Sequence, residues 1–408
     1  MSSSGDTTRK DPADRLGPND PPTAAAKSVF GPVMSRAADT RRAWQRLWRN
    51  IPTPARWLIG IIGVAFAYSL PLISRVSWLG VLFNTKANFA SLLGGTIIVY
   101  IIVALGLNVV VGLAGLLDLG YVGFYAIGAY TVAVLSSKHA NLPWLICLPI
   151  AIVVAMGSGV VLGAPTLRLR GDYLAIVTLG FGEIIRLLAQ KFDWLGAASG
   201  ISNIPFPPSV GPLKFGALHL NAFYYLGLTL VIIVYFFLHR LENSRVGRAW
   251  TAIREDEDAA ELMGVPTFKF KLWAFAIGAA VGSIAGTLYA TKTQFINPYN
   301  FDLRLSILFL AAVVLGGPGN MPGVILGAVA VSYLPERLRF LNTSRYFWFG
   351  VLLVVLMIFR PQGLWPRRQV ARVTAGDPEA PVALDEDIRD AGLTEDNVSL
   401  GDQGIPRS

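Results

Sequence analysis

The chain has 408 residues, of which 53% are hydrophobic and only 15% are charged, whereas a typical soluble domain has about 25% charged residues. This composition excludes an ordinary soluble protein and predicts an all-α, polytopic integral membrane protein with roughly 8–10 transmembrane or re-entrant helices. The net charge of +9 is interpreted through the positive-inside rule for membrane loops and not as a surface for nucleic acid. The single cysteine, Cys147, excludes a disulfide within the chain.

The two ends of the chain are polar and differ in charge. Residues 1–56 form an arm whose arginines crowd the first apolar segment, which predicts a cytoplasmic location and is compatible with an interfacial helix. Residues 369–408 are rich in acids and poor in aliphatic residues, so they are expected to form a disordered, acidic, cytoplasmic tail. The transmembrane domain is therefore expected to occupy residues 57–368.

Apolar segments follow one another between these ends, and several are shorter than the about 20 residues that a straight span needs. A count of crossings from a cytoplasmic N-terminus places the main basic loops inside, at Arg168, at residues 240–271 and at Arg360 to Arg368. The charged residues from Glu336 to Arg345 fall outside on this count, so we expect a missed or re-entrant segment near 304–334. The apolar segments are 57–74, 88–111, 112–135, 143–164, 173–190, 222–239, 272–290, 304–316, 321–334 and 346–360.

The segment from Gly112 to Tyr130 contains five glycines and one acid, Asp118. So many glycines allow a broken helix, which is tolerated at membrane depth only where the backbone is buried in protein or lines a cavity. Such half-helix ends commonly hold substrate in transporters, so Asp118 is expected either to contact a substrate ammonium or to cap a half-helix. Tyr121 and Tyr125 would share its face, where they line a pathway or pack between helices.

A second polar group lies in the fifth apolar segment. Glu183 and Arg186 are spaced i and i+3, so they can neutralise each other. An ionisable residue at membrane depth is a functional candidate, and both a structural ion pair and a substrate contact remain open for Glu183. Thr178 lies close to two glycines of the same segment, where the backbone has the freedom that a cavity lining would use.

A strongly charged stretch from Ser244 to Lys271 interrupts the apolar segments. Val246, Trp250 and Ile253 fall at i, i+4 and i+7, which predicts a helix with one apolar stripe on an otherwise solvated surface. Two short helices that meet at an angle can fill a groove. Residues 244–266 are therefore interpreted as a docking knob for a cytoplasmic partner.

The second helix of this knob carries its own start and stop signals. Asp258 is expected to cap it, with Glu261 reaching back to complete a capping box. Gly264 is expected to end the helix in the left-handed conformation, and Pro266 prevents its continuation.

The remaining sequence features are a glycine repeat that concerns helix packing and a lack of motifs for catalysis. Gly278, Gly282 and Gly286 recur every four residues, so their helix can approach its neighbours closely. The sequence contains no GxxxxGK[ST] motif, so if ATP drives the protein, the hydrolysing subunit must be another chain. The three histidines are scattered, and the sequence predicts no catalytic residue, no cofactor and no metal site.

Five runs of the sequence carry ordered motifs, at Gly106–Gly115, Leu119–Tyr130, Leu167–Glu183, Gly247–Glu257 and Val314–Gly317. They closely resemble the LivM-type permeases of bacterial branched-chain amino-acid ABC importers, from about residue 90 to residue 368. The resemblance implies a permease heterodimer with a LivH-like partner, two cytoplasmic ABC ATPase subunits and a periplasmic or lipid-anchored binding protein. It also implies a place in the bacterial cytoplasmic (inner) membrane, and the charge pattern described above predicts that both termini lie in the cytoplasm.

The same resemblance suggests roles for individual residues. Asp258-Ala259-Ala260 with Gly264 resembles the Glu-Ala-Ala-x-x-x-Gly coupling loop of such permeases, with Asp in place of Glu. The residues expected to couple to the ATPase are Trp250, Arg254, Glu257, Asp258, Ala259, Ala260 and Gly264. Those expected on the substrate pathway are Asp118, Tyr121, Tyr125, Thr178 and Glu183.

The expected function is inward transport of branched-chain or other hydrophobic amino acids, powered by separate ATPase subunits. Urea, a short amide or an aromatic acid remains an alternative cargo, because a binding protein selects cargo largely outside this chain. An autonomous transporter or channel would need an ion relay, and only Asp118 and Glu183 are available at depth. A purely structural scaffold would leave the acids in glycine-rich spans unexplained.

Overall fold

The computed structural model describes residues 68–69, 92–139, 141–167, 171–209, 215–216, 220–337, 344–359 and 363–365. The predicted N-terminal arm, the predicted acidic tail and all of the predicted first span except Tyr68 and Ser69 lie outside these residues. The elements are η2 Leu92–Ile97, α5 Ile98–Leu107, η3 Asn108–Leu113, α6 Val122–Ala133, η4 Val134–His139, α7 Trp144–Thr166, α8 Gly171–Lys191, η5 Asp193–Leu195, η6 Ala197–Ser199, β1 Ile201–Ser202, α9 Leu220–Glu242, α10 Arg245–Glu255, α11 Glu257–Leu262, α12 Thr267–Thr293, β2 Phe295–Ile296, η7 Pro298–Asn300, α13 Leu303–Gly316, α14 Met321–Arg337 and α15 Arg345–Phe359.

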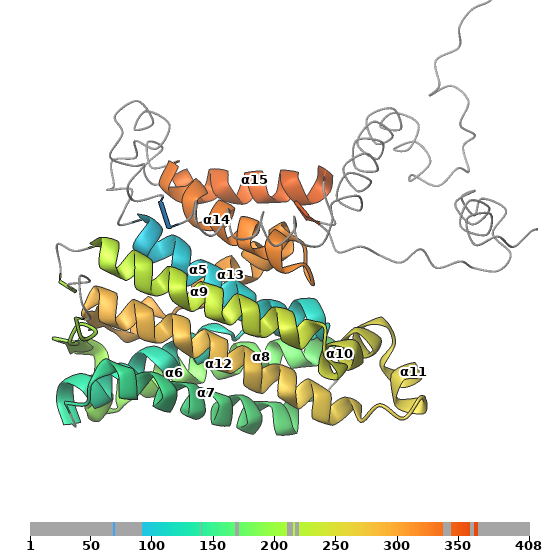
Figure 1. Ribbon diagram of the computed structural model, residues 1–408, viewed down its shortest axis with the longest axis horizontal. Helices are drawn as coiled ribbons and strands as arrows, with labels where there is room; N and C mark the ends of the chain where they lie inside the picture. The colour runs from blue at the N-terminus through green and yellow to red at the C-terminus, as the bar shows by residue number, and fades with distance from the viewer. Residues whose placement is uncertain are drawn as a thin grey trace, which may run out of the picture. The chain divides into compact units, whose positions relative to one another are not determined.

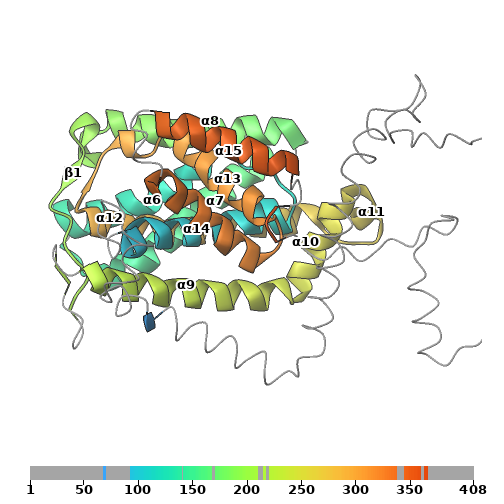
Figure 2. The same cartoon turned by 90° about the horizontal axis from the view of Figure 1, so that it is seen from above.

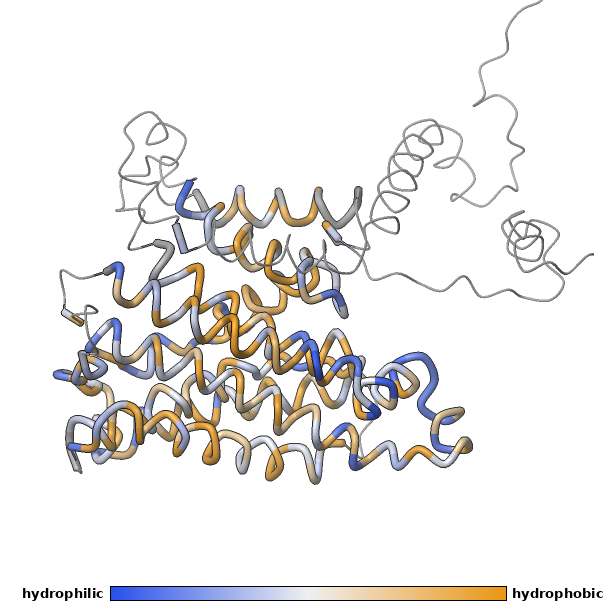
Figure 3. Tube along the Cα trace, viewed as in Figure 1, coloured by the Kyte–Doolittle hydropathy of each residue, from blue (hydrophilic) through white to orange (hydrophobic). Residues whose placement is uncertain are grey.

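Six helices in the described part of the chain are long and apolar enough to cross a membrane. Hydrophobic residues run along the helices, whereas hydrophilic residues gather around α10 and α11 (Figure 3). The all-α, polytopic fold predicted from the sequence is therefore confirmed. The six candidate spans are Gly95–Leu113, Trp144–Thr166, Tyr173–Lys191, Asn221–Glu242, Thr267–Thr293 and Pro298–Gly316.

The chain divides into two compact units. The first comprises residues 1–95 and 211–229, and its described part includes the beginning of α9. The second comprises residues 96–210 and 230–408. All of the residues discussed below as site residues belong to the second unit.

Helix α12 is the centre of the second unit, where it packs against α5, α6 and α7 (Figure 1). The three glycines spaced at intervals of four explain this close packing. A Cβ added at Gly278 would lie 2.6 Å from Cγ2 of Val110, and one at Gly286 would overlap the carbonyl oxygen of Tyr125. The close approach predicted from these glycines is confirmed, because only a missing side chain lets the backbones come so near.

Helices α13 and α14 form a tight antiparallel hairpin in the region where the sequence predicted a missed or re-entrant segment. A Cβ at Gly327 would overlap the carbonyl oxygen of Ala312, so the two helices are in backbone contact. Residues 317–320 form the turn, and the N–H of Gly319 donates to Oδ1 of Asn108 at 2.8 Å. The buried Asn108 side chain thereby fixes the hairpin turn beside η3.

The two ends of the helical bundle in this unit carry different structures (Figure 2). At one end, β1 pairs antiparallel with β2, with Ile201 opposite Ile296. This pairing ties the loop after α8 to the end of α12, so the short helix η7 packs against α8. Helices α10 and α11 lie at the other end, where α10 contacts α12 and η3.

Candidate functional site

The predicted break in the glycine-rich segment is present. The helical backbone ends with η3 at Leu113 and resumes with α6 at Val122, and Gly115 between them has a φ of +74°. A Cβ at Gly120 would overlap the backbone carbonyl of Thr178 in α8. The absence of a side chain at Gly120 therefore lets α8 lie directly on the break.

Asp118 and Thr178 satisfy backbone amides that the break leaves without helical partners. Asp118 is only 1% exposed, and its Oδ1 accepts the N–H of Gly120 at 2.8 Å. Its Oδ2 accepts no hydrogen bond from the described residues. Oγ1 of Thr178 accepts the N–H of Leu119 at 3.1 Å and donates to the carbonyl of Ala175. Both side chains stabilise the break, since unpaired buried amides are costly.

Tyr121 and Tyr125 are also buried in this interior. The Tyr121 hydroxyl donates to the carbonyl of Gly278 in α12 at 2.7 Å. The Tyr125 ring packs against Phe301 and Phe309, with ring centroids 5.5 and 5.6 Å away. The first four predicted pathway residues thus lie in a closely packed interior, between the break, α6, α8 and α12.

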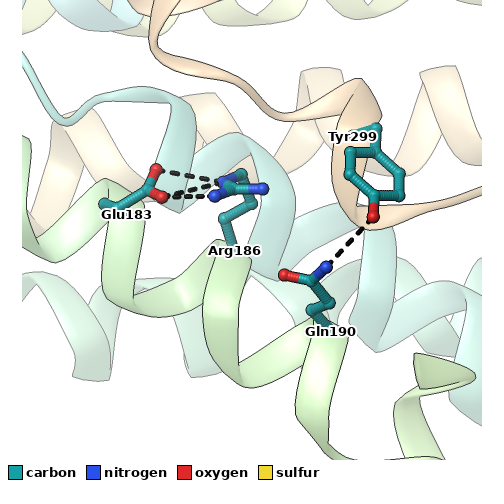
Figure 4. A network of polar contacts seen from close by, with 4 residues as sticks. All are labelled: Glu183, Arg186, Gln190 and Tyr299. Carbon is teal, nitrogen blue, oxygen red and sulfur yellow. Dashed lines mark hydrogen bonds and ion pairs between the residues drawn. The ribbon is translucent and has the colours of Figure 1, made fainter. Parts of the chain in front are cut away.

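Glu183 lies in a different environment, where its carboxylate faces the guanidinium of Arg186 along α8 (Figure 4). Its two carboxylate oxygens accept from Nε of Arg186 at 3.1 and 3.0 Å, so the predicted pairing is confirmed. The side chain of Glu183 is 41% exposed and that of Arg186 is 20% exposed. Further along the same helix, Nε2 of Gln190 donates to the Tyr299 hydroxyl of η7 at 3.1 Å.

The knob of residues 244–266 consists of α10 and α11, joined by one non-helical residue. Ser244 caps α10, and its hydroxyl accepts the N–H of Val246 at 3.2 Å. Asp256 caps α11, and its Oδ1 accepts the N–H of Ala259 at 2.9 Å. The prediction that Asp258 is the cap is wrong, because α10 already ends at Glu255 and the backbone is extended only at Asp256. Asp258 then lies inside α11, and the expected capping box does not form.

The predicted end of α11 is confirmed. Gly264 has a φ of +84°, which is the left-handed conformation that glycine adopts without strain. The N–H of Gly264 donates to the carbonyl of Glu261 at 2.9 Å, and the N–H of Val265 donates to that of Ala260 at 3.0 Å. These two bonds close the helix end as a Schellman motif.

The knob is fastened to the start of α12 by two side chains. Trp250 is fully buried, and its Nε1 donates to the carbonyl of Phe270 at 2.7 Å. The exposed carboxylate of Glu257 forms an ion pair with Nζ of Lys271, which is itself buried. Of the expected coupling residues, Trp250 and Glu257 therefore hold the knob against the membrane helices.

Arg254 connects the knob to the broken helix. Its guanidinium donates through Nη1 to the carbonyl of Gly112, in the last turn of η3. Its aliphatic stem lies against Gly115, where an added Cβ would be 2.8 Å from Cγ of Arg254. A displacement of α10 would therefore act directly on the segment that carries Asp118.

The tip of the knob is exposed and partly apolar. Asp258, Ala259 and Gly264 are exposed, whereas Ala260 is buried. Leu262 and Met263 are 88% and 85% exposed, although large apolar side chains are usually covered in soluble surroundings. This tip is a surface suited to a protein partner.

Comparison with known proteins identifies the family. The family model described as branched-chain amino acid transport system / permease component matches residues 89–360. The chain belongs to this family. It is 42% identical over 351 residues to the high-affinity branched-chain amino acid transport system permease protein LivM of Escherichia coli strain K12, with 80% of this chain and 81% of that relative covered. It is 26% identical to the LivH permease protein of the same strain, over 67% of this chain and 93% of that relative. No solved structure matches the chain.

The matched region of this permease contains the break, α8 and the knob. The sequence analysis missed Asp256 as the cap of α11, and it missed the exposed apolar tip formed by Leu262 and Met263. Gln190 was also missed, although its i+7 spacing from Glu183 places both side chains on one flank of α8. Nothing in the sequence indicated Tyr299, because it reaches α8 only through the pairing of β1 with β2.

Proposed function

We propose that this permease is the membrane subunit of an ATP-driven importer of branched-chain amino acids in the bacterial cytoplasmic membrane. It would work with a LivH-like permease partner, two cytoplasmic ATPase subunits and a substrate-binding protein outside the membrane. The similarity to LivM over four-fifths of both chains supports the cargo and the type of system. The chain itself carries no nucleotide-binding motif, which is consistent with ATP hydrolysis on other subunits.

The observation that carries this proposal is the attachment of an exposed knob to a broken membrane helix. In an ATP-driven permease, a soluble ATPase must move membrane helices through a contact at the membrane surface. The exposed tip with Asp258, Leu262 and Met263 supplies that contact. Arg254 then joins α10 to the break by its bond to the Gly112 carbonyl.

The expected coupling residues divide into three roles within this proposal. Asp258, Ala259 and Gly264 belong to the surface that meets the ATPase. Trp250 and Glu257 keep the knob fixed on α12, and Ala260 packs the inner face of α11. The interior residues Asp118, Tyr121, Tyr125 and Thr178 hold the broken helix in a shape that moves as one piece with α8.

The test is reconstitution of the permease with its partner subunits in proteoliposomes that contain ATP. Binding protein loaded with leucine should stimulate both ATP hydrolysis and leucine uptake. Stimulation by urea-loaded binding protein alone would contradict the cargo assignment. Failure of the purified chain to bind any ATPase would contradict the importer assignment.

A pair of knob variants tests the docking surface. Leu262→Gln combined with Met263→Gln removes the exposed apolar tip without touching the contacts to α12, so binding of the ATPase should weaken. Glu255→Gln is the matched control, because Glu255 is exposed but belongs to the last turn of α10 and not to α11. Equal ATPase binding by the two variants would place the docking surface elsewhere.

A further inference from the structure

The flank of α8 that carries Glu183 has a polar composition that its position in the membrane does not explain. Glu183, Arg186 and Gln190 are spaced i, i+3 and i+7, so they follow one side of the helix. Tyr299 joins this row from η7 through its bond to Gln190 (Figure 4). The three α8 residues of the row lie within the candidate span Tyr173–Lys191, of which only 28% is buried by the described residues.

Contact with lipid chains would be energetically unfavourable for the charged residues of this row. A carboxylate and a guanidinium at membrane depth face the interior of a bundle or a water-filled cavity in nearly all membrane proteins. The adjoining exposed face of α8 is aliphatic, with Ile176, Ile184 and Leu187 exposed, and it suits lipid or an apolar protein surface. The ion pair therefore marks the edge at which α8 turns from an apolar to a polar environment.

The charges of the pair match one class of cargo. An α-amino acid is a zwitterion, with an ammonium and a carboxylate on one carbon atom. The guanidinium of Arg186 can bind a carboxylate through two parallel hydrogen bonds, and the Glu183 carboxylate can accept from an ammonium. When the cargo binds, the Glu183–Arg186 ion pair is replaced by two ion pairs, one between Glu183 and the cargo ammonium and one between Arg186 and the cargo carboxylate. Every charge therefore keeps a partner within the membrane.

We infer that Glu183 and Arg186 form a transit site for the zwitterionic head group of an amino acid, on a polar pathway between α8 and the partner permease. This inference rests on the proposed function and narrows its substrate class to zwitterions. Gln190 and Tyr299 supply uncharged hydrogen-bonding groups one turn further toward the end that carries β1 and β2. When the cargo has passed, Arg186 and Glu183 pair again. Urea and neutral amides carry no charges that could replace this pair.

The first experiment separates a transit site from an ion pair that merely neutralises two charges at membrane depth. Glu183→Gln combined with Arg186→Gln (E183Q/R186Q) removes both charges, while the two amides can still hydrogen-bond to each other. For a transit site, the assembled complex should keep ATP hydrolysis stimulated by the binding protein but lose about tenfold or more of leucine uptake. Uptake equal to that of the wild-type complex would overturn the inference.

The second experiment does not depend on the assembly of that variant. Replacing Cys147 by alanine removes the only thiol of the chain. In that background, a thiol introduced by Gln190→Cys should react with a charged, water-soluble thiol reagent in proteoliposomes, and leucine-loaded binding protein with ATP should slow the reaction severalfold. Ile184→Cys is the matched control on the aliphatic face and should react much more slowly. Equal reaction rates at the two positions, or no effect of leucine, would overturn the inference.

The two proposals fail in different ways. The proposed function fails if the wild-type complex does not take up leucine. The transit site fails if the wild-type complex takes up leucine and E183Q/R186Q takes it up equally well. Size-exclusion chromatography of each complex checks that it is assembled, so a folding defect is not mistaken for a loss of transport.

Discussion

The contact between Gly120 and α8 makes a sharp prediction about stability. A Cβ at Gly120 would overlap the Thr178 carbonyl and lie 3.2 Å from the backbone nitrogen of Leu179. Both obstacles are backbone atoms, so the break and α8 would have to separate by more than about 1 Å, and such overpacking typically costs about 1–3 kcal/mol. Separation would also break the bond from Leu119 to Thr178, worth about 1 kcal/mol. Gly120→Ala should therefore destabilise the permease by about 2–4 kcal/mol.

Two glycines of α8 close to Thr178 in the sequence provide matched controls. A Cβ at Gly180 meets nothing within 4 Å, so Gly180→Ala should be neutral, or stabilising by up to about 1 kcal/mol through helix propensity. A Cβ at Gly182 would lie 3.3 Å from Cα of Gly120, so Gly182→Ala should fall between the two. Thermal unfolding of the purified variants in detergent, followed by tryptophan fluorescence, gives the order of their stabilities. If Gly120→Ala unfolded at or above the temperature of Gly180→Ala, the close packing of α8 on the break would be refuted.

Four substitutions in the knob give further predictions. Arg254→Gln removes the charged link to the broken helix, so leucine uptake per ATP hydrolysed should fall severalfold in proteoliposomes, and an unchanged ratio would contradict the link. Asp256→Ala removes the cap of α11 and should lower the stability of this helix by about 1 kcal/mol. Because α11 carries the docking surface, the ATPase should bind this variant more weakly in a titration. Asp258→Ala should leave the fold of α11 intact. If Asp258→Ala destabilised α11 more than Asp256→Ala, the assignment of Asp256 as the cap would be reversed. Trp250→Phe loses one buried hydrogen bond and should lower thermal stability by about 1 kcal/mol.

Features decided by neighbouring residues could be predicted from the sequence. The glycine-rich segment breaks where expected, Gly264 ends α11 in the left-handed conformation, and Glu183 pairs with Arg186. Each depends on backbone freedom or on spacing within one helix, which the sequence contains directly. The six candidate spans also follow from hydropathy, because a membrane helix must satisfy its own backbone.

Features decided by contacts between distant segments could not be predicted in the same way. Asp256 and Asp258 are chemically equivalent caps, and the choice depends on where α10 ends. The sequence grouped Asp118 with Glu183 as acids at membrane depth, yet the first is buried and the second is exposed on a flank. That difference arises from the packing of α8 on the break, which no local pattern specifies.

The same packing separates the parts that can move from those that cannot. A cargo passing between Asp118 and Tyr121 would have to push α6, α8 and α12 apart, and their backbones touch at glycines, where no side chains can rearrange. The flank of α8 requires no such separation.

Contacts run without interruption from the knob to that flank. Arg254 holds the Gly112 carbonyl, the break holds α8 through Leu119 and Thr178, and α8 carries Glu183. A pull on α10 should therefore shift the break and α8 as one rigid body. Such a shift changes the surroundings of the Glu183–Arg186 ion pair while the packed interior stays closed. We therefore expect Arg254→Gln to impair transport without altering the water accessibility of Gln190 in the resting complex.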